Sequence, residues 1–123
     1  MWVRFASAAA LAAALWSGPA LADEAQDGEA LFKRICMVCH TIEAGKSKLG
    51  PSLFGVVGRK AGTEAGFNYS EAMKNAGLTW DEETLDKYIA DPKAVVPGNK
   101  MAYAGVKKPD DRKAIIAYLK TVH

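Results

Sequence analysis

The sequence predicts a small all-α domain in which helices near the two ends of the chain cross, with shorter helices and loops between them. Near both ends, apolar residues recur at the three- and four-residue spacing of a helical face, and no segment shows the alternation of a strand. A length of 123 residues is that of one domain. The formal net charge of +2 is too small to indicate nucleic-acid binding, so we expect no nucleic-acid partner.

Residues 1–22 have the three parts of a secretory signal peptide. Arg4 is followed by an apolar run from Phe5 to Trp16, and small residues at Ala20 and Ala22 stand where a signal peptidase cuts. We therefore expect cleavage after Ala22, export to the periplasm, and a single mature domain over residues 23–123. An uncleaved membrane anchor is the alternative, but the run is shorter than the roughly 20 residues that a spanning helix needs.

The first helix of the domain is expected over residues 27–36, where Gly28, Leu31, Phe32 and Ile35 share one face. Because Gly28 has no side chain, this helix can cross the last helix closely, with Tyr118 filling the notch. The last helix is expected to begin at Pro109, and its apolar stripe consists of Ile115, Ile116, Tyr118, Leu119 and Val122. An ordinary helix with one tolerated glycine is the alternative.

Cys36, Cys39 and His40 have the Cys-x-x-Cys-His spacing by which c-type haem is attached. In such a site the two thiols form thioethers with the haem vinyl groups, and the imidazole binds the iron. A disulfide between the cysteines would close a tiny loop and constrain little of the unfolded chain. A zinc site would need four ligands, and the usual Cys and His set adds only His123. We expect one covalent haem c with its iron, with a disulfide or zinc site as the alternative.

Residues 41–69 are rich in glycine and are expected to form an ordered loop that wraps around the haem. A short helical turn is expected at 70–75. The next helix has the form of a capping box, since Thr79 is followed three residues later by Glu82. Its apolar face contains Leu85, Tyr88 and Ile89, and Asp91-Pro92 marks its end.

A sixth iron ligand decides between electron transfer and ligand chemistry, because the porphyrin and His40 fill the other five positions. The internal candidates are Met37, Met73 and Met101. Met37 is inside the attachment motif, on the wrong side to return to the iron, and Met73 falls in a predicted helical turn. Met101 ends a Pro-Gly-stiffened loop, residues 96–101, that could present its thioether to the opposite haem face.

Six motifs in register carry a resemblance to a known family. They are Cys36-Met37-Val38-Cys39-His40, Leu49-Gly50-Pro51-Ser52-Leu53, Gly58-Arg59-Lys60, Phe67-Asn68-Tyr69-Ser70, Leu78-Thr79-Trp80 and Pro97-Gly98-Asn99-Lys100-Met101. The chain resembles the class I c-type cytochromes, most closely the branch of bacterial cytochrome c2 and mitochondrial cytochrome c. The match runs from about Gly28 to Val122 and implies the cytochrome c fold.

The resemblance also implies roles for individual residues. His40 and Met101 are the axial ligands of the iron, and the Pro51 carbonyl accepts the other ring N–H of His40. The remaining residues implied around the haem are Arg59, Tyr69 and Trp80, which donate to a buried propionate, and Tyr88, which lies near Met101.

Three positions depart from the family pattern. Asn99 stands where Thr is common, and we place it among the haem-binding residues at the inner propionate. Met73 stands where Asn is usual, in the network behind the Met ligand. Tyr103 stands where Phe is usual, beside the exposed haem edge. We expect these three changes to affect the reduction potential of the haem and how easily the Met ligand is displaced.

Histidine and methionine together close the iron to substrates, so we expect a one-electron carrier and not an enzyme. The resemblance implies a monomer without stable membrane insertion that accepts electrons from a cytochrome bc-type complex. Its acceptor would be an oxidase, a photosynthetic reaction centre or a periplasmic reductase. Two alternatives are a haem-based ligand binder or small peroxidase, and a subunit held permanently in a redox complex.

Lysines gather near the proposed ligand loops although the net charge is close to zero. They are Lys46, Lys48, Lys60, Lys93, Lys100, Lys107 and Lys108. Many carboxylates fall elsewhere, at Asp81, Glu82, Glu83, Asp86, Asp110 and Asp111. We expect a positive haem edge that steers the protein towards acidic membrane partners; ordinary solvated lysines are the alternative.

Overall fold

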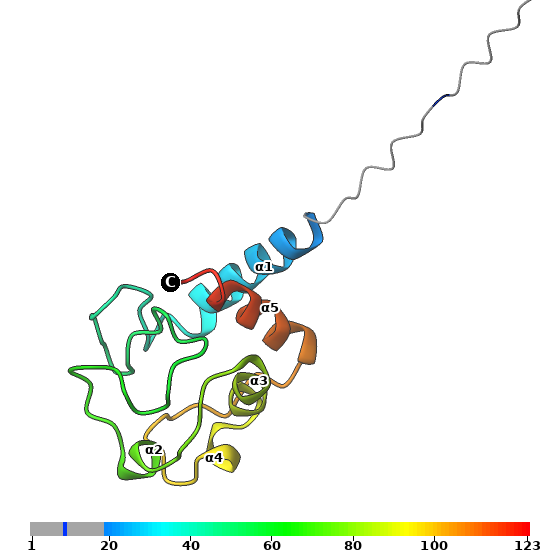
Figure 1. The fold of residues 1–123 in the computed structure, drawn as a ribbon. Coiled ribbons are helices and arrows are strands. Elements are labelled where there is room, and N and C mark those ends of the chain that lie inside the picture. Colours follow the sequence, from blue (N-terminus) through cyan, green and yellow to red (C-terminus); the bar gives the residue numbers. More distant parts are fainter. Residues whose placement is uncertain (1–8, 10–18) are drawn as a thin grey trace, which may run out of the picture.

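The computed structural model describes residue 9 and residues 19–123, and within these residues the secondary structure is helical (Figure 1). The helices are α1 (Pro19–Ile35), α2 (Glu71–Lys74), α3 (Glu82–Ala90), α4 (Pro92–Val95) and α5 (Pro109–Leu119). The described residues form no strand, and only Lys60 and Thr79 pair through an isolated antiparallel bridge. The predicted all-α fold is confirmed.

The predicted signal peptide lies mostly outside the described residues. Its expected cleavage point, after Ala22, falls in the first turn of α1, which begins at Pro19. Cleavage therefore stays a prediction. In the described part of the chain, no helix combines the length and the apolar character needed to cross a membrane.

Helices α1 and α5 pack side by side at one end of the domain, as predicted (Figure 1). A Cβ atom on Gly28 would lie only 1.8 Å from the carbonyl oxygen of Ala114 and 3.0 Å from Cβ of Tyr118. The rings of Phe32 and Tyr118 meet with centroids 5.5 Å apart. Gly28 therefore allows the close crossing. Val122 is also buried, but it lies beyond the end of α5 rather than on its face.

The start of α3 differs from the predicted capping box. The N-cap is Asp81, whose carboxylate accepts a hydrogen bond from the Thr84 N–H at 2.7 Å. Thr79 is instead paired with Lys60, and the Trp80 N–H donates to the Arg59 carbonyl at 2.8 Å. Because these bridge contacts keep the backbone out of the helix as far as Trp80, the Thr79 cap prediction is wrong by two residues.

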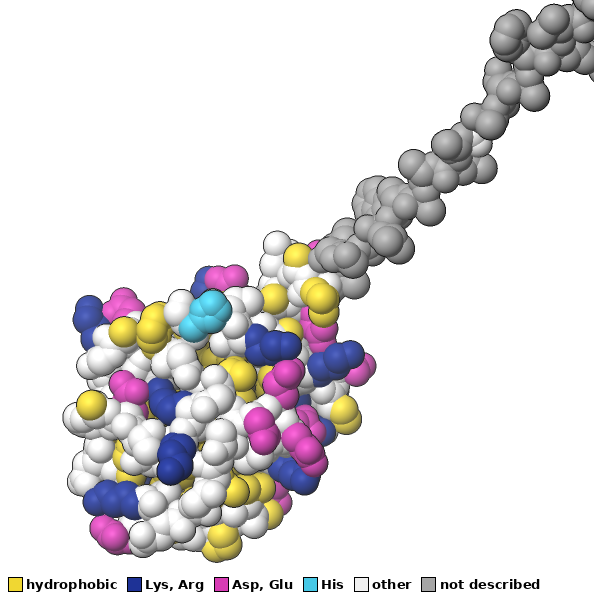
Figure 2. All heavy atoms as spheres, in the orientation of Figure 1, with side chains coloured by type: hydrophobic (Ala, Val, Ile, Leu, Met, Phe, Trp, Pro, Cys, Tyr) yellow, Lys and Arg dark blue, Asp and Glu magenta, His cyan; other side chains and the backbone are white. Residues whose placement is uncertain are grey.

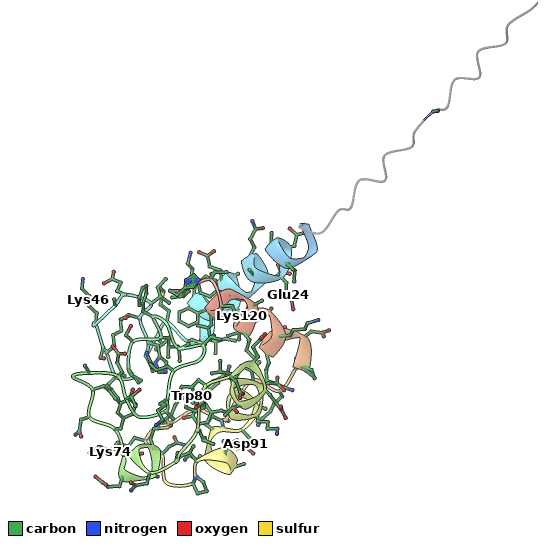
Figure 3. The ribbon with its side chains drawn as sticks, viewed as in Figure 1. Glu24, Lys46, Lys74, Trp80, Asp91 and Lys120 are labelled. Carbon is green, nitrogen blue, oxygen red and sulfur yellow. The ribbon has the colours of Figure 1, made fainter. Side chains whose placement is uncertain are left out.

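The other short helices also follow side-chain caps. Ser70 caps α2 by accepting the Met73 N–H, which confirms the helical turn expected at 70–75. Asp91 follows the last residue of α3 and then caps α4, a helix that no pattern in the sequence predicts. Pro92 therefore both ends α3 and begins α4. Figure 3 shows Asp91 beside these helices.

One buried cluster joins the helices to the long loop. Its members include Phe32, Val56, Trp80, Leu85, Val96 and Ile115. The loop over residues 41–69 contains no helix, but backbone hydrogen bonds tie it to distant segments. The Gly55 N–H donates to the Val122 carbonyl, and the Ala61 N–H to the Leu78 carbonyl, both at 2.8 Å. The loop is therefore ordered, as predicted.

Candidate haem centre

The Cys-x-x-Cys-His motif forms a tight turn that continues α1. The Cys36 N–H donates to the Phe32 carbonyl at 2.8 Å, and the His40 N–H donates to the Cys36 carbonyl at 2.9 Å. Cys36 and Cys39 are both free and half-buried. Burial raises the pKa of the Cys36 thiol to about 11, and the neighbouring Cys39 adds to the shift. The turn therefore brings two thiols and one imidazole together within five residues.

His40 makes the hydrogen bond that the family resemblance implies. Its Nδ1 lies 2.7 Å from the Pro51 carbonyl oxygen. Burial lowers the pKa of the imidazole, and the positive charge of Arg59 lowers it further, against the opposite effect of the Pro51 bond. Because a carbonyl can only accept, Nδ1 carries the hydrogen and Nε2 keeps its lone pair. His40 is thus prepared to bind a metal through Nε2.

Gly50 provides the space that the His40 ring occupies. A Cβ atom at this position would lie 2.3 Å from Cε1 and 2.6 Å from Nδ1 of the imidazole. The Gly50 N–H also donates to the Cys39 carbonyl at 2.8 Å. Gly50 and Pro51 therefore hold the attachment turn and the imidazole from the same short stretch of loop.

Arg59 is the most highly connected of the predicted propionate donors. Its Nη1 pairs with Glu64 Oε2 at 2.9 Å and also contacts the Phe54 carbonyl, while Nη2 donates to the Ser52 carbonyl at 3.0 Å. The side chains of Arg59 and Glu64 are only 15% and 17% exposed. The Arg59 Nε is buried and has no hydrogen-bond partner among the described residues. A buried guanidinium N–H calls for an acceptor, and an anionic group such as a haem propionate would supply one.

The other predicted haem neighbours lie around Arg59. The Tyr69 hydroxyl accepts the Glu64 N–H at 3.1 Å, which leaves its own hydrogen available to donate. Trp80 lies in the interior (Figure 3), joined to Arg59 by the backbone bridge and packed on Tyr88 with ring centroids 4.8 Å apart. The structure thus gathers Arg59, Tyr69, Trp80 and Tyr88 into one region.

Met101 is half-buried and packs against the buried cluster. Asn99 binds its own loop: its Nδ2 donates to the Pro92 and Val96 carbonyls, and its Oδ1 accepts the Met101 N–H. Met73 is a core residue with 8% exposure. Tyr103 is 37% exposed and lines a surface hollow together with Asp91 and Lys93.

These residues fit a covalent haem. Two thiols, an imidazole and a thioether form a donor set of the kind that holds haem c, and the unpartnered Arg59 Nε suits a propionate. Within the described ranges, no group of three or more His, Cys, Asp and Glu side chains could hold a metal ion.

Two residues of this region were missed by sequence reasoning. Glu64 binds Arg59 from five residues further along a loop, where no helical or strand period links the two positions. Ser52 is fully buried, donates to the Glu43 carbonyl at 2.6 Å and accepts the Phe54 N–H. A charge pair within one loop is a weak signal for Glu64, and no pattern marks Ser52 as buried.

Comparisons with known proteins agree with this arrangement. The model of the cytochrome c family matches residues 25–123. Cytochrome c2 iso-2 of Magnetospirillum molischianum is 62% identical over 88 residues, which cover 72% of this chain and 91% of the relative. Cytochrome c2 of Rhodomicrobium vannielii is 54% identical over 114 residues, covering 91% of this chain and 90% of the relative.

Among solved structures, cytochrome cH from Methylobacterium extorquens superimposes with a TM-score of 0.75. It is 48% identical in sequence, and the match covers 79% of this chain and 97% of that structure. This likeness agrees with the predicted cytochrome c fold.

Proposed function

Because this chain belongs to the cytochrome c family, we propose that it is a one-electron shuttle of the periplasm whose haem iron is held by His40 and Met101. The protein carries one covalent haem c and is an electron-transfer protein, not an enzyme. When bound, the haem iron accepts one electron and gives it back. The observation that carries the proposed ligation is the His40–Pro51 hydrogen bond beside the cysteine turn.

On the His40 side, this chain's residues fix the position and the orientation of the cofactor. Cys36 and Cys39 would hold it through thioethers, so that it cannot dissociate. Pro51 keeps the His40 tautomer in which Nε2 is free, and its hydrogen bond strengthens the imidazole as a ligand. Gly50 leaves room for the ring. These contacts would hold the imidazole in one orientation in both charge states of the iron.

The Met101 thioether would be the second protein ligand of the metal. A soft sulfur ligand favours the reduced metal and raises the reduction potential. With His40 and Met101 both bound to the metal, neither water nor a substrate would reach it. Electron transfer then needs little change in geometry, as an efficient carrier requires.

The propionates would be held by the cluster around Arg59. The guanidinium Nε, the Tyr69 hydroxyl and the Trp80 indole N–H can donate to a carboxylate, which costs a large free energy to bury without such partners. Tyr88 packs on Trp80 from α3, and both side chains are buried.

Surface charge supports docking to acidic partners near the Met101 loop. Lys48 donates to the Met37 carbonyl inside the attachment turn, Lys93 lines the hollow beside Tyr103, and Lys100 precedes Met101. On the face shown in Figure 2, acidic side chains gather over α3 and α5, but lysine and arginine side chains lie among them and pair with several. A positive face around the Met101 loop would steer association with acidic partners, and salt would screen the effect.

We infer the donor and acceptor classes from membership of the cytochrome c family, in which the relatives of this chain include proteins named cytochrome c2. The donor would be a cytochrome bc-type complex, and the acceptor an oxidase, a photosynthetic reaction centre or a periplasmic reductase. With the bc-type complex as donor, Lys93→Gln and Lys100→Gln should slow electron transfer several-fold at low salt, whereas Lys113→Gln in α5 should not. Equal rates for all three variants, or rates that do not fall as salt rises, would contradict the proposed docking face.

The ligation is tested by redox titration and absorption spectroscopy of the wild-type holoprotein and of Met101→Ala. The wild type should show a reversible one-electron couple and should not bind CO when reduced. Met101→Ala should bind CO and have a lower reduction potential. Met73→Leu is the matched control, because a buried methionine outside the coordination should tolerate a volume-conserving change. Binding of CO by the reduced wild type would reject the proposed His40–Met101 ligation.

The location is tested separately by cell fractionation and by the mass of the purified protein. Periplasmic haem protein that begins at Asp23 is expected. Recovery of the holoprotein with the membranes and with residues 1–22 intact would favour the anchored alternative.

A further inference from the structure

We propose that Asn99 is a positioning residue that holds the backbone of Met101, and not a ligand of the haem propionate. This inference rests on the proposed role of Met101 as an iron ligand. It replaces the haem-binding role that the family resemblance implies for Asn99. The basis is that protein carbonyls take both N–H donors of the Asn99 amide, while its oxygen accepts the Met101 N–H.

Three hydrogen bonds connect the Asn99 side chain to both sides of the loop. Its Nδ2 donates to the Pro92 carbonyl at 3.0 Å and to the Val96 carbonyl at 2.8 Å. Its Oδ1 accepts the Met101 N–H at 2.8 Å. One planar amide therefore links the carbonyls of α4 and its C-cap to the backbone of the residue that carries the thioether.

The chemistry of an amide makes this use exclusive. A carboxamide has two N–H donors, and both of those on Asn99 point to carbonyls of the protein. No hydrogen on this side chain is left to donate to a propionate. A threonine hydroxyl carries a single donor and cannot make the same two bonds while it accepts from Met101.

Beyond Met101 the chain is held again a few residues later. Lys107 Nζ donates to the Ala90 carbonyl at 2.7 Å and to the Ala104 carbonyl at 2.9 Å, and the Val106 N–H donates to the Ile89 carbonyl. Met101 therefore lies between the Asn99 anchor and this second anchor on α3. Loss of the Asn99 anchor should free the near side of the loop and make the thioether easier to displace.

The test measures displacement of Met101 by imidazole in the ferric holoprotein. Asn99→Ala should bind imidazole about ten-fold more tightly than the wild type, the change expected for the loss of a hydrogen bond to a neutral partner. Asn99→Thr should also bind it more tightly, since it cannot replace both carbonyl contacts. Asn75→Ala removes an exposed asparagine elsewhere and should leave the affinity unchanged.

Two further measurements separate this inference from the proposed ligation. In a Met101→Ala background, Asn99→Ala should no longer change imidazole affinity, because the displaced ligand is gone. Amide hydrogen exchange at residue 101 should be about ten-fold faster in Asn99→Ala even if Met101 were not the ligand. If wild type and Met101→Ala bind imidazole equally, the proposed ligation by Met101 is wrong. The hydrogen-exchange result then still tests whether Asn99 holds the Met101 backbone.

Unchanged imidazole affinity and unchanged exchange in Asn99→Ala would overturn the inference. A propionate role would instead appear as a reduction potential that changes its pH dependence in Asn99→Ala without any change in imidazole affinity. That outcome would also reject the positioning role.

Discussion

Gly50 and His40 lie so close that a Cβ atom on Gly50 would stand 2.3 Å from Cε1 of the imidazole. The backbone φ of Gly50 is outside the left-handed region, so the constraint comes from the neighbouring ring and not from backbone strain. We therefore expect Gly50→Ala to displace the His40 imidazole from its position beside Pro51 and to destabilise the holoprotein by about 2–3 kcal/mol. Absorption spectra and guanidinium unfolding would measure both effects.

Gly45→Ala is the matched control for this change. Gly45 has open space around it but a φ of +72°, so alanine there should cost only about 1–2 kcal/mol and leave the spectrum intact. A Gly50→Ala protein with a native spectrum and native stability would show that the ring can move without loss.

The crossing of α1 and α5 gives a second prediction. Gly28→Ala should raise helix propensity by about 1 kcal/mol, yet its methyl group would overlap the Ala114 carbonyl oxygen. Since that obstacle is backbone, the helices must separate, and we expect a net loss of about 3 kcal/mol or more. Guanidinium unfolding would measure it, with the exposed Gln26→Ala in the same helix as a near-neutral control. A stabilised Gly28→Ala protein would disprove the close crossing.

Arg112 connects three segments around the second anchor of the Met101 loop. Its Nε binds Asp86 at 2.7 Å, and its Nη1 donates to the Val106 and Lys107 carbonyls at 3.0 Å. Because the Arg112 side chain is only 13% exposed, Arg112→Met should cost about 2–3 kcal/mol through the partners left unpaired. Chemical denaturation would measure the loss.

Lys113→Met is the control on the same helix. The Lys113 side chain is 76% exposed and lies 3.9 Å from Glu24, so its loss should change stability by less than about 0.5 kcal/mol. Similar costs for the two variants would mean that Arg112 contributes only as surface charge.

The buried phenol of Tyr88 leads to a prediction of how stability changes at alkaline pH. Burial raises the pKa of its phenol from 10.0 to about 12. Between these values the unfolded chain releases the proton while the folded protein keeps it, so stability should be intact below pH 10 and fall as pH rises towards 12. The contribution of this one group is about 2–3 kcal/mol.

Denaturant unfolding of wild type and Tyr88→Phe across this range would test it. The Tyr88→Phe variant should lack this part of the loss of stability at alkaline pH. Tyr103→Phe should remove a smaller part of that loss, because Tyr103 is more exposed. Parallel pH profiles for wild type and Tyr88→Phe would contradict the prediction.

Much of the fold follows from local patterns. The spacing of Phe32 and Ile115 with their neighbours predicts the two terminal helices, and Pro109 predicts the start of α5. Helix boundaries were less accurate. Thr79 and Asp81 are both acceptable N-caps in sequence, and the pairing of Lys60 with Thr79, nineteen residues apart, decides between them.

The residues of the candidate haem centre also differ in how far the sequence predicts them. The motif of Cys36, Cys39 and His40 predicts the cofactor because attachment chemistry needs those groups at that spacing. The bond from Arg59 to Glu64 and the burial of Ser52 have no such local rule. They depend on how a loop without periodic structure folds back on itself.

The sequence by itself therefore determined the cofactor, the helical faces and the family, since these depend on residue types at short, regular separations. Only the tertiary structure decided that Gly50 makes room for His40 and that the Asn99 side chain accepts the Met101 N–H. The physical reason is that hydrogen bonds and steric contacts act over a few ångströms in space, and the groups that they join are brought together by packing of segments far apart in the chain.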